Sequence, residues 1–193
     1  MTVIAVVGHL ARTDGNFSLN DMPGSAGRMD VLARCVNASL FLSHDLRRDT
    51  DCFLVLLGPP APPKTVLFRG SEVRYLSPDE RSAGSLLKKA LDLPCGDEFR
   101  ESTKGVFVRK GGLARLLAEH RFAVLDESGT DIRSAGSLPE AVLLSDHQNL
   151  TDEEMALAAG CPKFSVGPRS LHADHAIITL MNEIDRREAG WNS

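Results

Sequence analysis

The sequence lacks the features of membrane-spanning, secreted and zinc-binding proteins. No apolar run approaches the roughly 18 to 20 residues that a bilayer-spanning helix needs. The N-terminal stretch TVIAVVGHLAR has no basic segment before its apolar residues and no small-residue cleavage site, so we expect no signal peptide. The cysteines form no CxxC pair and have no histidine at zinc-ligand spacing, which favours free thiols in a reducing cytoplasm. They are Cys35, Cys52, Cys95 and Cys161.

The chain also has no excess of positive charge. Its formal net charge is -4, which argues against a protein that coats nucleic acid non-specifically, because such binding rests on many lysines and arginines. Arg28, Arg34 and the RRD stretch at 47–49 are the residues that would form a local basic patch. Hydrophobic residues at 42% and charged residues at 25% are ordinary for a globular protein. With 193 residues, we expect one domain covering 1–193.

Apolar runs alternate with helical patterns along the whole chain, which predicts an α/β fold with a largely parallel sheet and helices on both faces. The runs CFLVLLG and AVLLS are continuously hydrophobic, as expected of strands that are buried on both sides. The PPAPP segment between two of the strands is a stiff connector. The expected strands are 2–8, 52–58, 65–70, 105–110, 122–126, 141–145 and 163–167. The expected helices are 29–43, 78–92, 112–120, 151–159 and 172–187.

Three of these helices carry more specific signals. In the last helix, an apolar stripe follows the i, i+3, i+4, i+7 spacing. In the helix at 78–92, Ser77 is the expected cap, with Pro78 at the first position and Glu80 completing a capping box. In the helix at 29–43, Asp30 and Arg34 are spaced for an i, i+4 ion pair. A polar face of this helix would continue through Asn37, Phe41 and His44 towards Arg47 and Arg48.

Polar side chains gather where the strands at 122–126, 141–145 and 163–167 end. In open α/β sheets, ligands bind beyond the carboxyl ends of the strands. Histidines and carboxylates can ligate a divalent ion, but the HEXXH spacing is absent. The simpler interpretation is that these groups cap the last helix and hydrogen-bond the turn before it. The residues concerned are Asp146, His147, His172, Asp174 and His175.

Four segments, in the same order and at similar spacing, resemble the archaeal tRNA pseudouridine-54 N1-methyltransferases of the SPOUT superfamily. The resemblance covers nearly the whole chain. It implies an α/β fold whose C-terminal segment is threaded through a loop to make a deep trefoil knot, with S-adenosylmethionine (SAM) held by the knot loops. It also implies a homodimer whose tRNA groove combines both subunits. The segments are GSAGRMDVLARCVNASLFLSHDLRRD, LSPDER, LLSDHQN and SVGPRSLHADHAI.

The resemblance assigns cofactor contacts to the same strand ends. Ser145 stands where relatives often have glycine, which narrows the pocket, and Ala176 stands where some have cysteine. His172 and His175 would fix the turn before the knotted helix and contribute to the dimer interface. The implied cofactor-binding residues are Leu125, Ser145, Val166, Gly167, Pro168, Arg169, Ser170, Leu171 and Ala176.

The implied reaction transfers the methyl group of SAM to N1 of pseudouridine in the T-loop of tRNA. The protein must position two reactants in line and manage one weakly acidic proton. A carboxylate can accept that proton or hydrogen-bond the base edge, and we assign this role to Asp79 first and Asp30 second. No metal is expected. The arginines expected to bind phosphates or the base are Arg28, Arg34, Arg47, Arg48 and Arg81.

Three alternatives remain open at this point. The first is an N1-pseudouridine methyltransferase that acts on small-subunit ribosomal RNA. The second is a non-catalytic RNA-binding or ribosome-assembly protein that has kept the cofactor pocket. The third is a metal-dependent hydrolase built on Asp146, His147, His172 and His175.

Overall fold

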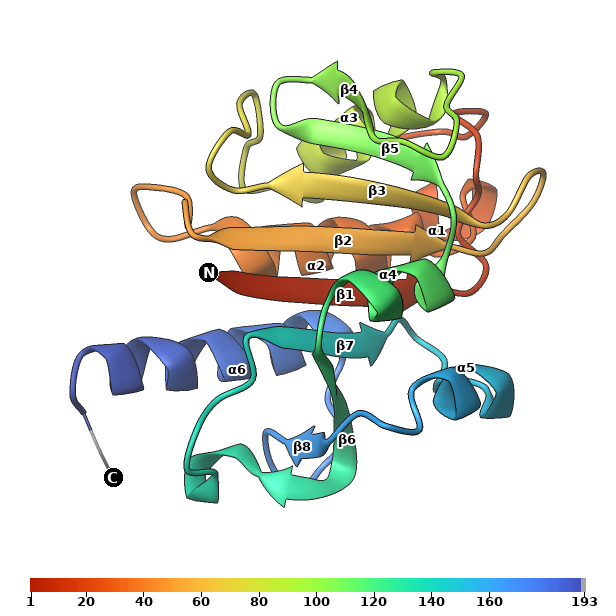
Figure 1. Cartoon of the computed structure of the whole chain (residues 1–193). Helices are drawn as coiled ribbons and strands as arrows, with labels where there is room; N and C mark the ends of the chain where they lie inside the picture. Colours follow the sequence, from red (N-terminus) through yellow and green to blue (C-terminus); the bar gives the residue numbers. More distant parts are fainter. Residues whose placement is uncertain (192–193) are drawn as a thin grey trace.

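A computed structural model describes residues 1–191, whose strands form one eight-stranded sheet in the order β4-β5-β3-β2-β1-β7-β6-β8 (Figure 1). The strand β1 lies between β2 and β7, so segments from both ends of the chain meet at the centre of the sheet. The strands are β1 (Thr2–Gly8), β2 (Thr50–Leu56), β3 (Lys64–Arg69), β4 (Arg100–Thr103), β5 (Val106–Lys110), β6 (Phe122–Asp131), β7 (Ala141–Ser145) and β8 (Lys163–Ser165).

The sheet is mixed, which corrects the expectation of a largely parallel one. The neighbours of β1, β7 and β6 are all parallel, and this half of the sheet follows the predicted pattern. On the other side of β2, the strands β3, β5 and β4 pair antiparallel. The connector 57–63 between β2 and β3 is too short for a crossover helix, so these two strands can only form a hairpin.

Helices cover both faces of the sheet, as predicted. The long helices α2 (Met29–Leu40), α3 (Glu80–Leu91) and α6 (Ala173–Glu188) pack on one face, where α2 contacts both of the others. The short helices α4 (Leu113–Glu119) and α5 (Asp152–Leu157) cover the other face. The four-residue α1 (Met22–Ser25) and the 3-10 turn η1 (Ile132–Ser134) lie in connections.

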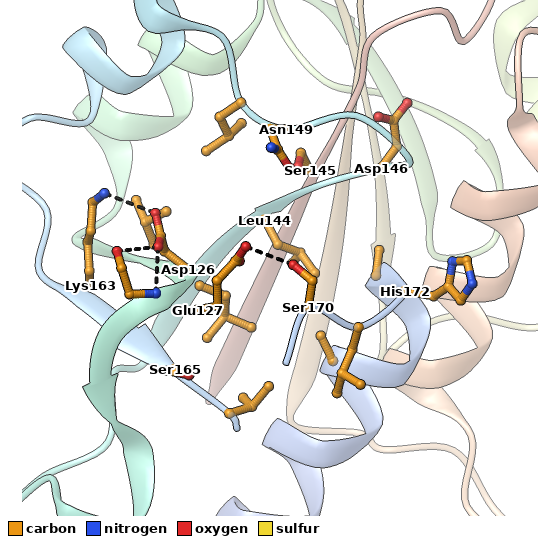
Figure 2. Close-up of a pocket in the computed structure, with 18 of the residues that line it drawn as sticks. Asp126, Glu127, Leu144, Ser145, Asp146, Asn149, Lys163, Ser165, Ser170 and His172 are labelled. Carbon is orange, nitrogen blue, oxygen red and sulfur yellow. Dashed lines mark hydrogen bonds and ion pairs between the residues drawn. The ribbon is translucent and has the colours of Figure 1, made fainter. Parts of the chain in front are cut away.

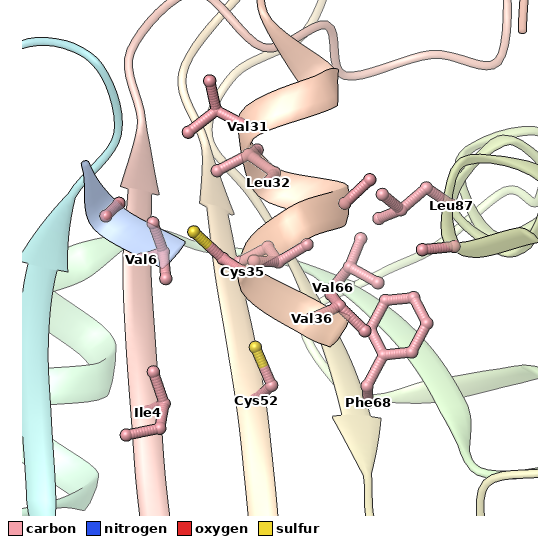
Figure 3. Close-up of a cluster of buried hydrophobic side chains, with 14 of the residues drawn as sticks. Ile4, Val6, Val31, Leu32, Cys35, Val36, Cys52, Val66, Phe68 and Leu87 are labelled. Atoms are coloured by element: carbon pink, nitrogen blue, oxygen red, sulfur yellow. The ribbon is translucent and has the colours of Figure 1, made fainter. Parts of the chain in front are cut away.

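The larger core lies between the sheet and α2, α3 and α6 (Figure 3). Alternate residues of β1 divide between the two cores: Ile4 and Val6 face this side, whereas Val3 and Ala5 face α4 and α5. The continuously apolar β2 and β7 divide in the same way, with Leu54 and Val142 in this core and Phe53 and Leu143 in the other, so both strands are buried on both sides as predicted. All four cysteines are free thiols, and burial raises the pKa of Cys52 to about 12.

Two helix boundaries differ from the prediction. The helix α2 ends at Leu40, because Phe41 is extended and forms a bridge with Leu46. The predicted polar face therefore does not continue along a helix to His44. The helix α3 begins at Glu80, two residues late, and Asp79 rather than Ser77 is its N-cap. The predicted capping box is wrong, because the Asp79 Oδ1 atom accepts from Ser82 N at 2.7 Å.

The C-terminal helix was predicted to within one residue at each end. Its apolar stripe, which consists of Ile177, Leu180, Met181 and Ile184, is buried against the larger core, as the spacing indicates.

The strand β4 was not predicted, because its residues are exposed or half-buried and carry no apolar run. The strand β6 continues to Asp131 through a register shift, where a loop was expected. No helix within residues 1–191 is long and apolar enough to cross a bilayer.

Candidate functional site

A cavity of about 590 Å³ opens beside the carboxyl ends of β7 and β8 and the middle of β6, next to the first turn of α6 (Figure 2). β6, β7 and β8 are parallel neighbours, and the cavity lies where the predicted strands 122–126, 141–145 and 163–167 end, as the strand-end rule expected. Its volume lies within the roughly 300–1,000 Å³ range of small-molecule sites. Its walls come from 124–128, 144–150, Met155, Lys163, 165–167, 169–173 and Ala176.

One wall of the cavity is fixed by polar contacts between β6 and β8. The Asp126 carboxylate accepts hydrogen bonds from Ser128 N at 2.8 Å and from its hydroxyl at 2.5 Å, and Lys163 Nζ lies 2.9 Å away. These hydrogen bonds and the lysine charge lower the pKa of Asp126 to about 2. The Ser170 hydroxyl donates to Glu127 at 2.8 Å across the opening. The 126–128 segment and the loop after β8 are therefore joined before any ligand binds.

The loop after β8 begins with a tight turn. The Ser165 hydroxyl donates to Gly167 O at 2.7 Å and accepts from Gly167 N at 3.2 Å. Nothing lies within 4 Å of the position that a Gly167 side chain would take, so the glycine keeps this part of the wall open. The three residues of the turn, 165–167, all line the cavity.

The structure brings eight of the nine predicted cofactor residues to this one cavity. Leu125 ends the regular part of β6, Ser145 ends β7 and Ala176 lies in the first turn of α6. The loop contributes Val166, Gly167, Arg169, Ser170 and Leu171. Pro168 is the exception: it is exposed and is not part of the cavity wall.

The predicted carboxylate Asp30 lies outside the cavity wall, at the centre of an ion-pair network on the α2 face. Arg28 contacts it through two nitrogens at 3.0 and 3.1 Å, and Arg34 Nη1 lies 3.1 Å away. Arg34 also contacts Glu80 of α3 at 3.2 Å and Asp174 of α6 at 3.4 Å. The predicted Asp30–Arg34 pair is confirmed. Burial alone would raise the pKa of Asp30, but the two arginines outweigh it and lower the pKa.

Arg28 has a strained backbone in this network. Its φ is 65° and that of the preceding Gly27 is 63°, so two successive residues adopt the left-handed conformation. A non-glycine residue in this region costs of order 1–3 kcal/mol, and such strain clusters at functional sites.

The other predicted polar residues are engaged within the chain, and of these Arg47 is mostly buried. Asp79 is exposed and caps α3. Arg47 forms two 2.6 Å contacts with the Asp185 carboxylate, and Arg48 donates to two backbone carbonyls of the loop after β3. Arg81 donates to Asn20. None of the five predicted RNA-binding arginines lines the cavity within residues 1–191.

The histidines at the start of α6 do not cap it with their side chains, which corrects that interpretation. His172 occupies the N-cap position but makes no side-chain cap hydrogen bond. Its ring packs edge-on against His175, with ring centroids 5.6 Å apart. Within residues 1–191, no three histidine, cysteine or carboxylate side chains are arranged to hold a metal ion, so the constellation required by the hydrolase alternative is not assembled.

Comparison with known proteins decides the family. The family described as "Putative SAM-dependent RNA methyltransferase" matches residues 1–189. The chain belongs to this family. A relative from Methanocorpusculum labreanum, named tRNA (pseudouridine(54)-N(1))-methyltransferase, is 60% identical and covers 97% of this chain and 98% of its own length. A relative of the same name from Methanospirillum hungatei is 53% identical and covers 99% and 100%.

A solved structure shares the fold of this RNA methyltransferase. The crystal structure of Archaeoglobus fulgidus Nep1 bound to S-adenosylhomocysteine has a TM-score of 0.67, covering 97% of this chain and 98% of its own. Its sequence identity is 14%, so the likeness concerns the fold. The two proteins therefore share the mixed α/β architecture.

Sequence reasoning missed several polar residues of the cavity in this methyltransferase. Asp126, Glu127, Asn149 and Lys163 all line it. The signal for the first two was present, because DE follows the apolar run FAVL at a strand end. Lys163 carries no comparable signal: it opens β8 and reaches the cavity only because β8 pairs with β6.

Proposed function

We propose that this chain is a SAM-dependent methyltransferase that methylates N1 of pseudouridine in the T-loop of tRNA. The observation that carries the proposal is the single cavity whose walls contain eight of the nine cofactor residues expected from the family motif. The choice of RNA and nucleotide is supported by full-length relatives with this name, at up to 60% identity.

The residues of the cavity fit SAM in both size and chemistry. Leu125, Val166 and Leu171 supply apolar surface for the adenine, while backbone groups of the 166–171 loop supply hydrogen bonds to its edge. Lys163 can pair with the carboxylate of the methionine part, and Glu127 can accept from its hydroxyl or amino groups. The bound cofactor supplies a methyl group on a sulfonium, which already activates it for transfer.

We also propose that the C-terminal segment is knotted. The helix α6 packs against the sheet core on one side and against η1 on another. Arg187 of α6 donates to Ile132 O at 2.6 Å and to Ala135 O at 2.8 Å, which fastens the β6–β7 connection onto the helix. Because the β6–β7 connection lies against α6, it supports the proposal that the C-terminal segment passes through the loop that this connection forms.

We propose the same two carboxylates for contact with the substrate base as were assigned from the sequence. Asp79 stays our first candidate for the carboxylate that accepts from N1, with Asp30 second. Asp30 is supported by its burial and by the strained Arg28 beside it. Asp79 has to exchange its capping bond for the base, because its Oδ1 atom accepts from Ser82 N.

The arginines have to exchange partners in the same way to bind phosphates. Arg28, Arg34 and Arg47 are paired with carboxylates within the chain, so each RNA contact replaces an existing ion pair. A homodimer would bring two sets of arginines to one groove and offset the net charge. Leu171 and Ile178 are 44% and 55% exposed around the start of α6, which supports an interface there.

We also propose that the chain forms one domain and acts in the cytoplasm. The one sheet that runs from β1 to β8 supports a single methyltransferase domain; residues 192–193 of the predicted range lie outside the described residues. Four free thiols support a reducing compartment, the cytoplasm.

A competition experiment tests the choice of RNA. Labelled SAM is offered with equal amounts of a pseudouridylated tRNA T-arm and a pseudouridylated small-subunit rRNA hairpin. Preferential labelling of the T-arm is expected. Preferential labelling of the rRNA hairpin would overturn the tRNA assignment, and binding of both RNAs without transfer would support the non-catalytic alternative.

A further inference from the structure

His9 lies between two carboxylates directly behind the cavity wall. It follows β1, and its ring Nδ1 lies 2.9 Å from Asp146 Oδ1 while Nε2 lies 3.0 Å from Glu154 Oε2. The three side chains are 9%, 1% and 10% exposed. Both ring nitrogens therefore face carboxylate oxygens in a nearly dry environment.

The two carboxylates also hold the loop between β7 and α5. Asp146 accepts from His9 N and from Gln148 N, each at 3.0 Å. Glu154 Oε2 accepts from Thr151 N at 2.8 Å, which completes the capping box of α5. Residues 145–150, which include the first anchor and lead towards the second, line the cofactor cavity. His9 is thus the link that ties β1 to both ends of one cavity wall.

Two carboxyl partners favour a protonated ring. An imidazolium donates from both nitrogens, whereas a neutral imidazole would direct a lone pair at one carboxylate. Within residues 1–191, no lysine or arginine nitrogen lies within 4.0 Å of either carboxylate. Two other basic groups face Asp146: His147 Nδ1 lies 3.2 Å from its Oδ2 atom, and the charge of Arg28 acts on Asp146 at longer range. Burial would lower the pKa of His9, but the hydrogen bonds and charges of Asp146 and Glu154 outweigh it and raise the pKa.

We propose that His9, as an imidazolium, is a positioning residue for the methyl donor, because it holds the 145–150 loop in the shape that forms the cofactor cavity. This inference rests on the proposed function. His9 acts through Asp146 and Glu154 and is not itself part of the cavity wall. As pH rises through its raised pKa, the ring loses a proton, one carboxylate loses its donor, and the loop loses an anchor.

Calorimetric titration of the full chain with S-adenosylhomocysteine, from mildly acidic to alkaline pH, tests this inference. Wild-type affinity should fall as pH rises, and His9→Gln should bind about tenfold more weakly near neutral pH without that His9-dependent fall. Subtracting the affinity curve of His9→Gln from that of the wild type removes the effect of groups that titrate in both proteins. In methyl transfer, the KM for SAM should rise in His9→Gln while the KM for RNA stays unchanged.

Glu154→Gln provides a second variant if His9→Gln fails to fold. It keeps the side-chain length but removes one negative partner, so its affinity should begin to fall at lower pH than that of the wild type. Wild-type affinity and pH profile in a folded variant would overturn the positioning role and leave the proposed function intact. A wild-type chain that binds no S-adenosylhomocysteine would overturn the proposed function, and the role of His9 with it.

Discussion

Arg34 on α2 reaches Asp174, the second residue of α6, with its Nε atom 3.4 Å from Oδ2. Two residues that flank this aspartate in sequence, Ala173 and Ala176, line the cofactor cavity. The contact between Arg34 and Asp174 therefore connects the cavity to the α2 face. The same arginine contacts Asp30 and Glu80, and thereby holds α2, α3 and α6 together. The other oxygen of Asp174, Oδ1, is buried without a hydrogen-bond partner, so Arg34 is the main compensation for this charge.

Replacing Arg34 with alanine should destabilise the fold. Three carboxylates would lose their shared partner, and the buried Asp174 would keep only His175, whose Nε2 lies 3.8 Å away. The expected cost is about 1–2 kcal/mol, because the Arg34 side chain itself is about one-third exposed and its ion pairs are partly screened by solvent. Urea denaturation measures this loss. Arg34→Lys, which keeps the charge but not the fork geometry, should lose less. Equal stability of the alanine variant and the wild type would show that the network contributes nothing to the fold.

Asp79→Asn separates the capping role of this residue from its proposed chemical role. Asparagine caps a helix about as well as aspartate, so α3 should keep its stability, whereas Asp79→Ala should lose about 1 kcal/mol. Without a carboxylate, turnover should fall by about 100-fold or more while cofactor affinity is retained. Single-turnover methyl transfer and calorimetry measure the two quantities. An Asp79→Asn enzyme with wild-type turnover would reduce Asp79 to a structural cap and make Asp30 the first candidate.

Gly27→Ala should disturb the start of α2 severely. Gly27 has φ +63°, and an added Cβ would lie 1.8 Å from Leu10 O. The strained backbone and the clash should together cost at least about 2 kcal/mol. Gly96→Ala is the matched control, because nothing lies within 4 Å of its added Cβ. Thermal unfolding of the two variants checks this, and equal melting temperatures would contradict the packing of Gly27 against the loop after β1.

Asp126 should contribute to stability only above acidic pH. Its pKa is lowered from 3.8 to about 2 in the fold, so the unfolded chain takes up a proton first as pH falls. The stabilisation is therefore present above pH of about 4 and is lost as pH approaches about 2. Urea denaturation at a series of acidic pH values should show a shallower decline for Asp126→Asn than for the wild type. Parallel declines would mean that the Lys163 and Ser128 contacts do not persist in solution.

The parallel half of the fold and its cavity were predictable because both depend on local pattern. Apolar runs marked β1, β7 and the start of β6, and the strand-end rule placed the site at their carboxyl ends. The antiparallel hairpin of β2 and β3 was missed because their hydrophobicity resembles that of parallel strands. The role of Asp79 as a cap was missed because Ser77 and Glu80 offered an equally good local signal. His9 could not be found at all, since its partners lie 137 and 145 residues away in sequence.

The central claim is methylation at N1 of pseudouridine, and one measurement tests it most directly. Two matched tRNA transcripts, one with pseudouridine in the T-loop and one with uridine there, are incubated with the protein and labelled SAM. The account predicts label only in the first, recovered as N1-methylpseudouridine after digestion to nucleosides. Equal labelling of both transcripts, or label on another atom of the base, would contradict it.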